Sequence, residues 1–421
     1  MRPARCGPDR SDFPSASFRR FLPLPSSPSA SCRMNRLLSL VLAFGLVFFA
    51  AGGAAAQALQ PPDVAARNYV LVDLTSNQTL AEREADAPVD PASLTKLMTA
   101  YVVFTALRDR KITLAQTFPV SVRAWSERKG GGSLMFIDPK MTPTVDDLLR
   151  GLIVISGNDA AVALAEGVSG SVEAFVEAMN RQAVAFGLKN TSFRNVTGVT
   201  EAGHRSTVRE LATIASRVVK DFPEYYPYYS MKDFRYNNIT QPNRNTLLQR
   251  DPSVDGMQTG YTEAAGYCLV ASAQRDIPTG KRRLVAVVLN TASIGARANE
   301  AQKLLNWGYQ AFDTVRLFDA GKTIVNPAPP VWKGQESVVQ LGAPGAVFAT
   351  VPRGEGDKLV TRIERIDPLV APLAKGQRVG TVKVTMATGK PVTEVPLVVL
   401  RPVEEAGVFG RAWDALRLWI K

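Results

Sequence analysis

Strand-like segments on both sides of a long helical stretch limit the folds open to the first three quarters of this chain. Apolar runs of strand length bounded by turn residues predict strands, and 3.6-residue apolar periodicity predicts helices. The predicted strands are 68–74, 78–81, 266–274 and 283–290, and the predicted helices are 144–155, 159–168, 171–186, 206–221 and 296–312. Strands that enclose a helical insert indicate an α+β domain.

Ser93 and Lys96 lie one helical turn apart at the start of an apolar segment that predicts a largely buried helix. Residues at this spacing share a helix face. A serine hydroxyl is a poor nucleophile until a base removes its proton, and lysine can be that base only when burial or a nearby cation lowers its pKa. The alternative is that Ser93 caps the helix and Lys96 is solvated.

Two further polar motifs follow in the chain. Ser156-Gly157-Asn158 falls at the break between two predicted helices, where polar side chains can point into a cleft. The alternative is a helix–helix turn in which Asn158 and Asp159 act as caps. The third motif is Gln258-Thr259-Gly260, and the glycine-rich segment 129–133 is interpreted as a flexible loop near the active site.

The three motifs occur in the order S-x-x-K, S-x-N and K-T-G, so the chain resembles the penicillin-binding proteins and serine β-lactamases. The flanking segments 91–100, 154–161 and 254–262 are similar to the D-alanyl-D-alanine carboxypeptidase branch. The similarity runs from about Tyr69 to the C-terminus. It implies an antiparallel sheet covered by helices, with a helical subdomain and the active-site cleft between them.

The resemblance also implies roles for individual residues. Ser93 would attack the carbonyl of a D-Ala-D-Ala terminus, Lys96 would take its proton, and Ser156 would relay a proton to the leaving amine. Asn158 would orient Lys96 or bind the substrate backbone, and Thr259 would contact the terminal carboxylate. The expected catalytic residues are Ser93, Lys96 and Ser156, and the expected substrate-binding residues are Asn158, Gln258, Thr259, Gly260, Arg209 and Arg297.

Gln258 departs from the family pattern, which has a lysine at this position. The lysine's charge supports the substrate carboxylate and helps to keep Lys96 neutral. Replacing a charged hydrogen bond by a neutral one costs roughly 1.5 kcal/mol, or on the order of tenfold in rate. We therefore expect an attenuated enzyme in which Arg209 or Arg297 supplies part of the missing positive charge.

Two other functions remain open from the sequence. One is a β-lactamase, and the other is a wall-binding or scaffold protein that kept the cleft and lost turnover. A Ser-His-Asp hydrolase is disfavoured because it would have to use His204, the single histidine. We expect no metal or other cofactor, and no nucleic-acid partner. The expected partners are peptidoglycan stem peptides, β-lactam antibiotics and a membrane surface.

The chain ends suggest an exported protein with several parts. Met34-Asn35-Arg36 and the apolar run after it predict a signal peptide over 34–58, which leaves 1–33 as a disordered extension or a mis-assigned start. We expect a catalytic domain over 59–314, a β-rich domain over 315–403 and a helix over 404–421. Cys268 is the single cysteine after the signal segment, so no internal disulfide is expected.

The C-terminal helix is amphipathic. One face carries Phe409, Ala412, Trp413, Leu416, Trp419 and Ile420, and the other carries Arg411, Asp414, Arg417 and Lys421. Tryptophans on the apolar face of such a helix are typical of segments that lie in a membrane surface. We therefore expect anchoring to a membrane surface, and the family resemblance implies the periplasmic face of the cytoplasmic membrane. The alternative is a terminal helix that packs on the β-rich domain.

Overall fold

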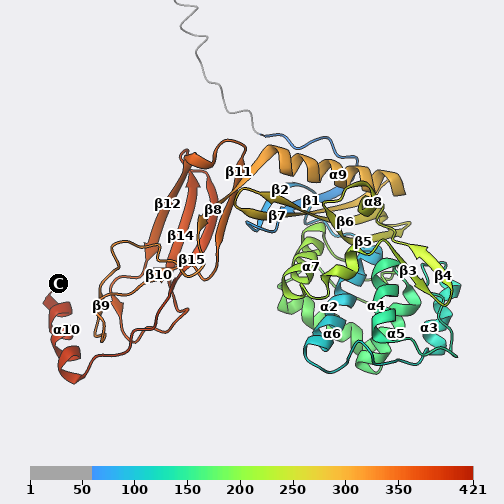
Figure 1. Ribbon diagram of the computed structural model, residues 1–421, viewed down its shortest axis with the longest axis horizontal. Coiled ribbons are helices and arrows are strands. Elements are labelled where there is room, and N and C mark those ends of the chain that lie inside the picture. The colour runs from blue at the N-terminus through green and yellow to red at the C-terminus, as the bar shows by residue number, and fades with distance from the viewer. Residues whose placement is uncertain (1–58, 421) are drawn as a thin grey trace, which may run out of the picture. The chain divides into compact units, whose positions relative to one another are not determined.

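The computed structural model describes residues 59–420 (Figure 1). The predicted N-terminal extension (1–33) and signal peptide (34–58) lie outside the described residues. No helix in the described part of the chain is both long and apolar enough to cross a membrane.

A five-stranded antiparallel sheet forms the centre of the first domain, with the strand order β2-β1-β7-β6-β5. Its strands are β1 (Asn68–Asp73), β2 (Gln78–Arg83), β5 (Val254–Thr262), β6 (Gly266–Ile277) and β7 (Gly280–Thr291). The four predicted strands are confirmed. β5 was not predicted, because its two glycines and its aspartate have low strand propensity. It therefore takes its strand conformation from pairing with β6.

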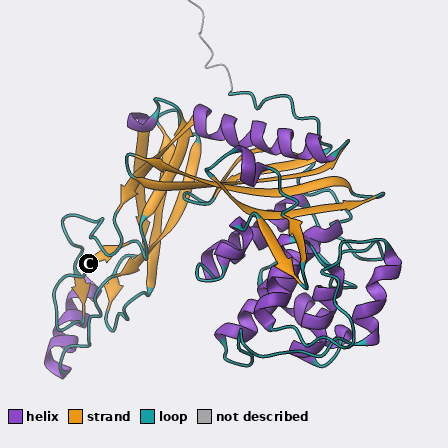
Figure 2. Cartoon of the chain, turned by 45° about the vertical axis from the view of Figure 1, so that its right-hand side comes forward, coloured by secondary structure: helices purple, strands orange, loops and turns teal. Residues whose placement is uncertain are grey.

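The central strands are buried on both faces, and alternate residues enter two different cores. Val70, Val285 and Val287 pack against the helical part of the domain. Leu71, Leu284 and Ala286 point the other way, towards α9 (Ile294–Ala311). This follows from the two-residue period of a strand. Figure 2 shows α9 on one side of the sheet and the other large helices of this domain on the opposite side.

The predicted helices are confirmed with small shifts at their ends. They are α2 (Lys96–Arg108), α4 (Val145–Val154), α5 (Asn158–Ser169), α6 (Val172–Ala185), α7 (Val208–Asp221) and α9. Thr144, Ser171 and Thr207 cap the N-termini of α4, α6 and α7 with their side-chain oxygens. The short helices α3 (Val122–Ser126) and α8 (Leu247–Arg250) and the hairpin β3 (Asp233–Tyr236)–β4 (Ile239–Pro242) were not predicted.

An all-β domain follows α9, as predicted. β8 (Phe312–Phe318) pairs with β11 (Val347–Pro352), and a second sheet has the order β10-β15-β14-β12. The members of that sheet are β10 (Leu341–Gly342), β15 (Pro391–Val399), β14 (Arg378–Met386) and β12 (Leu359–Arg365). β8 begins at Phe312, so the change of architecture falls at the end of α9.

A buried polar network connects the first sheet to β8 and β11. Asp73 on β1 accepts hydrogen bonds from Arg282 Nε (2.8 Å), Thr314 Oγ1 (2.9 Å) and Thr350 Oγ1 (2.8 Å). Asp73 and Arg282 are almost completely buried. The ion pair therefore satisfies two charges that would be costly to bury alone.

Candidate active site

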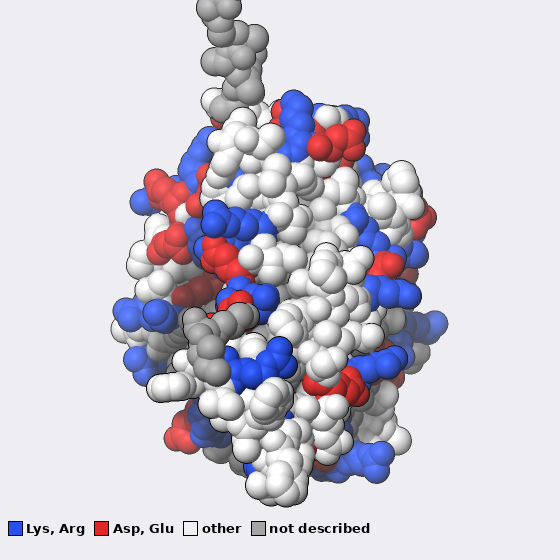
Figure 3. All heavy atoms as spheres, turned by 90° about the vertical axis from the view of Figure 1, so that its left-hand side faces the viewer, with Lys and Arg blue, Asp and Glu red and all other residues white. Residues whose placement is uncertain are grey.

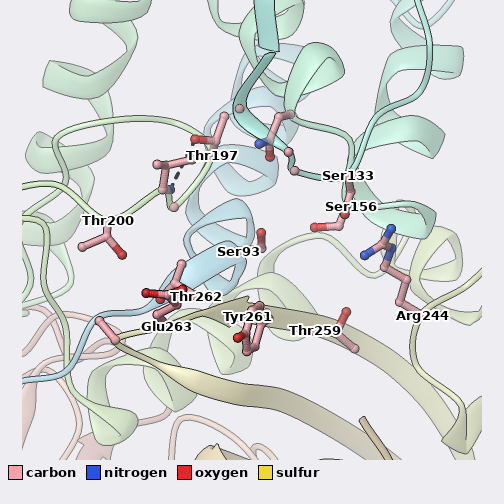
Figure 4. Close-up of a pocket in the computed structure, with 18 of the residues that line it drawn as sticks. Ser93, Ser133, Ser156, Thr197, Thr200, Arg244, Thr259, Tyr261, Thr262 and Glu263 are labelled. Atoms are coloured by element: carbon pink, nitrogen blue, oxygen red, sulfur yellow. Dashed lines mark hydrogen bonds between the residues drawn. The ribbon is translucent and has the colours of Figure 1, made fainter. Parts of the chain in front are cut away.

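The three motifs line one cleft of about 830 Å³. Ser93, Ser156, Asn158, Thr259 and Gly260 all contribute to its walls. Figure 4 shows Ser93 and Ser156 facing the same space, with Thr259 on the strand β5 below them. The glycine-rich loop, predicted to lie near the active site, also lines the cleft through residues 130–133.

Ser93 lies on the 3₁₀ turn η2 (Ala92–Thr95), which leads directly into α2. The turn places Lys96 Nζ 3.0 Å from Ser93 Oγ, so the two residues share a face as predicted. The turn packs closely on β5, because a Cβ atom at Gly260 would lie 3.1 Å from both the Ala92 Cβ and the Ser93 nitrogen. Ala92 has a φ of 47°, a strained conformation for a residue with a side chain.

Lys96 is buried and has three polar neighbours. Its Nζ lies 2.8 Å from Asn158 Oδ1, 2.7 Å from the carbonyl oxygen of Thr197 and 3.0 Å from Ser93 Oγ. Two of these partners can only accept hydrogen bonds. In a neutral amine they would take both N–H groups and leave the nitrogen lone pair directed at the Ser93 hydroxyl.

The pKa of Lys96 is lowered to about 7, chiefly by burial. Glu127 and Asp159 oppose this change because carboxylates favour the charged amine, whereas Arg244 adds to it. A substantial fraction of Lys96 is therefore neutral near neutral pH. The geometry and the pKa together fit a general base for Ser93.

The second motif occupies the break between α4 and α5. Ser156 has a φ of 63°, and Asn158 is the first residue of α5. Strained backbone of this kind concentrates at functional sites, where it aims a side chain. Asp159 holds the adjacent loop by accepting hydrogen bonds from the amides of Met135 (2.8 Å) and Ile137 (3.2 Å).

The third motif lies on β5. Gln258 is 2 % exposed, and its Nε2 donates to Ser156 Oγ over 3.1 Å. Thr259 lines the cleft, whereas Gln258 is not among the residues that line it. Arg297 on α9 donates to the carbonyl oxygen of Gly260 over 3.0 Å and lines the cleft. Burial is the main cause that lowers the pKa of Arg297 to about 10.

Arg209 does not lie in the cleft, and the expectation that it supplies charge there is wrong. Its guanidinium forms ion pairs with Glu82 (2.8 Å) and Asp86 (2.8 Å) beside the hairpin β1–β2. These carboxylates hold the pKa of Arg209 above its ordinary value and neutralise its charge locally.

Among the site residues that sequence reasoning missed, Thr197 and Arg244 act on Lys96. The carbonyl oxygen of Thr197 is a main-chain group and leaves no signal in the sequence. Arg244 lines the cleft near Ser156 (Figure 4). Arg244 and its neighbours Asn243 and Asn245 form a polar Asn-Arg-Asn tripeptide, which was the sequence signal for an ordered polar loop.

His204 is close to the nucleophile turn without contacting Ser93. Its Nδ1 accepts from the Arg194 amide (3.0 Å), so Nε2 carries the hydrogen and donates to Thr95 Oγ1 (2.8 Å). Burial is the main cause that lowers the pKa of His204. Burial also raises the pKa of the Cys268 thiol to about 12, which makes it unreactive. Within residues 59–420, no cluster of His, Cys, Asp or Glu is arranged to hold a metal ion.

Two family descriptions match the chain. Residues 55–293 match the family described as D-alanyl-D-alanine carboxypeptidase. Residues 312–405 match the family described as penicillin-binding protein 5, C-terminal domain. The two matches cover the sheet-and-helix domain and the all-β domain in turn.

Relatives and solved structures agree with these matches. D-alanyl-D-alanine carboxypeptidase DacC of Escherichia coli (strain K12) is 44% identical over 377 residues, covering 88% of this chain and 92% of the relative. DacA of Haemophilus influenzae is 42% identical and covers 86% of this chain and 91% of the relative. The crystal structure of penicillin-binding protein 5 from Haemophilus influenzae aligns with a TM-score of 0.77 at 42% identity, over 82% of this chain and 99% of that one. The chain therefore belongs to the D-alanyl-D-alanine carboxypeptidase family of serine peptidases.

Proposed function

We propose that this protein removes the terminal D-alanine from peptidoglycan stem peptides through an acyl-enzyme on Ser93. The observation that carries the proposal is the position of Lys96, which lies 3.0 Å from Ser93 Oγ with both of its other contacts made to acceptors. β-Lactam antibiotics would acylate the same hydroxyl, because their ring amide presents a similar carbonyl.

In the proposed reaction, Lys96 and Ser156 transfer the proton that leaves the Ser93 hydroxyl. Ser93 Oγ attacks the carbonyl carbon of the D-Ala–D-Ala bond as its proton moves to Lys96 Nζ. The C–N bond then breaks, and Ser156 passes a proton from Lys96 to the departing amine. Water attacks the resulting ester with Lys96 again as base, which releases the shortened peptide and restores the Ser93 hydroxyl.

The remaining predicted residues bind the substrate in this proposal. Asn158 orients Lys96, and Thr259 contacts the terminal carboxylate from the strand that lines the cleft. Arg297 adds positive charge at the same strand, because it is held against the Gly260 carbonyl. Backbone amides, including that of Ser93, would form the oxyanion hole.

Intact-mass spectrometry tests the proposal directly. The mature protein is incubated with benzylpenicillin, and separately with a D-Ala-D-Ala tripeptide while free D-alanine is measured. We expect a penicilloyl adduct that maps to Ser93, together with release of D-alanine. Ser93→Ala should abolish both, whereas Ser230→Ala, at an exposed serine outside the cleft, should change neither.

The other outcomes distinguish the alternatives. Rapid turnover of a chromogenic cephalosporin without D-alanine release would support a β-lactamase. Absence of both the adduct and D-alanine release from folded protein would refute the enzyme and favour a wall-binding or scaffold function.

We propose in addition that Gln258 attenuates the enzyme. Gln258 donates one neutral hydrogen bond to Ser156, where the family has an ammonium group. Gln258→Lys should raise the rate of D-alanine release about tenfold, because it restores a charged hydrogen bond. An unchanged rate in a folded variant would refute attenuation.

We propose that α10 (Val408–Ile420) anchors the protein to the periplasmic face of the cytoplasmic membrane. Its aromatic side chains are exposed: Phe409 is 93 % and Trp419 85 % exposed. The helix instead contacts the β-domain through its polar face, where Asp414 accepts from the amide of Lys333 (2.7 Å). This contact leaves the apolar face free to enter a membrane surface. Figure 3 looks onto this side of the molecule and shows uncharged surface bordered by both basic and acidic side chains.

Vesicle flotation tests the anchor. The mature protein should float with vesicles that contain anionic lipid, and the double change Trp413→Glu and Trp419→Glu should abolish flotation. The double change Val122→Glu and Val184→Glu places the same two charges at other exposed apolar residues and should have no effect. Equal flotation of both variants would refute the role of α10.

A further inference from the structure

Arg244 is an unpaired cation in a cleft whose third motif has lost its charge. Among residues 59–420, Arg244 has no hydrogen-bonding or ion-pair partner, and its side chain is exposed along the cleft. Arg209 differs, because two carboxylates neutralise it. Glu263, the carboxylate that lines the cleft, lies at the opposite end from Arg244 (Figure 4).

The loop around Arg244 is built to present this side chain. Asn243 and Asn245 on either side of it are 8 % and 2 % exposed. Asn243 Nδ2 donates to the Met231 carbonyl (2.9 Å), and Asn245 Nδ2 donates to the Gly256 carbonyl (2.9 Å). Gly256 precedes Gln258 by two residues on β5. The loop is thus fixed to the strand of the third motif, while the arginine between its two anchors points into the cleft.

The charge of Arg244 acts on the same groups that a lysine at position 258 would affect. Arg244 reaches into the end of the cleft occupied by Ser156, the serine to which Gln258 donates (Figure 4). The charges acting most strongly on Lys96 are Glu127 and Asp159, which favour its protonated form, and Arg244, which opposes it. Arg244 also lowers the pKa of Arg297 across the cleft.

We propose that Arg244 supplies part of the positive charge that Gln258 does not carry, and that it thereby keeps Lys96 competent as a base in this chain, although attenuated. The inference rests on the proposed carboxypeptidase function. Arg244 acts through Lys96 and Ser156, so it is a positioning residue and not itself a catalytic one. It explains how a member of the family can keep the S-x-x-K base without the lysine of the third motif.

A double-mutant cycle tests the proposal with four proteins: wild type, Arg244→Gln, Gln258→Lys and the double variant. Rates of acylation by benzylpenicillin and of D-alanine release are measured across pH. Arg244→Gln should lower both rates at pH 7 by about tenfold or more, because a charged group is lost. The acid limb of its pH–rate profile, where the rate rises as Lys96 loses its proton, should move to higher pH. Removing a cation favours protonated Lys96 and so raises its pKa.

In the Gln258→Lys background, Arg244→Gln should lower the two rates less than about threefold, because the lysine that replaces Gln258 already supplies a positive charge. Arg244→Lys should retain most of the activity. Arg250→Gln, on the adjacent helix α8, removes an exposed arginine whose partner is Asn299 and should change neither rate. Equal losses in the two backgrounds, or no loss with Arg244→Gln, would overturn the proposal.

Failure of the proposed function would be recognised separately. If wild-type protein is neither acylated nor active on the tripeptide, the carboxypeptidase proposal fails. The ionisation of Lys96, followed by NMR in lysine-labelled wild type and Arg244→Gln, then tests Arg244 without turnover. A higher pKa for Lys96 in the variant supports the role of Arg244, and an unchanged pKa refutes it.

Discussion

Asn158→Asp adds one negative charge beside the base while preserving the shape of the side chain. Asn158 Oδ1 lies 2.8 Å from Lys96 Nζ, and both residues are buried. Coulomb's law at this distance with an effective dielectric constant of about 20 gives an attraction of about 6 kcal/mol. That energy corresponds to moving the acid limb of acylation from about pH 7 to about pH 11.

The expected loss of acylation rate in Asn158→Asp follows from the fraction of Lys96 that is neutral. At pH 7.5 the neutral fraction of Lys96 falls on the order of a thousandfold if the limb moves this far. Stopped-flow acylation by benzylpenicillin between pH 6 and 10.5 measures both the rate and the limb. We expect activity to rise with pH through about 7 in wild type, because the neutral amine is the base. The variant should recover only at alkaline pH.

Asn158→Ala is the matched control, because it removes the same hydrogen bond to Lys96 without adding charge. It should lower the rate while leaving the acid limb much closer to that of wild type. If the rates of both variants rise with pH over the same range as in wild type, Lys96 is not the group that titrates, and the assignment of the general base is wrong.

Two further substitutions test the packing around the site and the fold. Asp73→Asn should lower the free energy of unfolding in urea by about 3–5 kcal/mol, because it leaves the buried Arg282 uncompensated. Asp313→Asn, in an exposed ion pair, should cost less than about 1 kcal/mol, and similar losses would contradict the argument. Gly132→Ala should slow acylation about tenfold without unfolding the protein. The added Cβ would lie 2.3 Å from Asn158 Nδ2 and displace that side chain. Unchanged kinetics would show that the loop around Gly132 moves and Asn158 does not.

Most helices and strands, and the three polar motifs with their order along the chain, could be predicted from the residues alone. Apolar periodicity gave the large helices and the strands β1, β2, β6 and β7, because those segments bury one or both faces. The spacing of Ser93 and Lys96 placed both on one face of a turn, since three-residue spacing on a helix is a local property. The departure at Gln258 was also visible without a structure.

Which residues from distant parts of the chain come together depends on the folded structure. β5 has weak strand propensity and becomes a strand through its pairing with β6, so its strand conformation could not be read from its residues, although the motif that it carries could. Arg209 and Arg244 are chemically identical, yet carboxylates on β2 and the following loop neutralise the first. Two buried asparagines hold the loop that presents the second to the cleft. The base likewise depends on the Thr197 carbonyl and on complete burial, because a lysine pKa near 7 is a property of its surroundings rather than of the side chain.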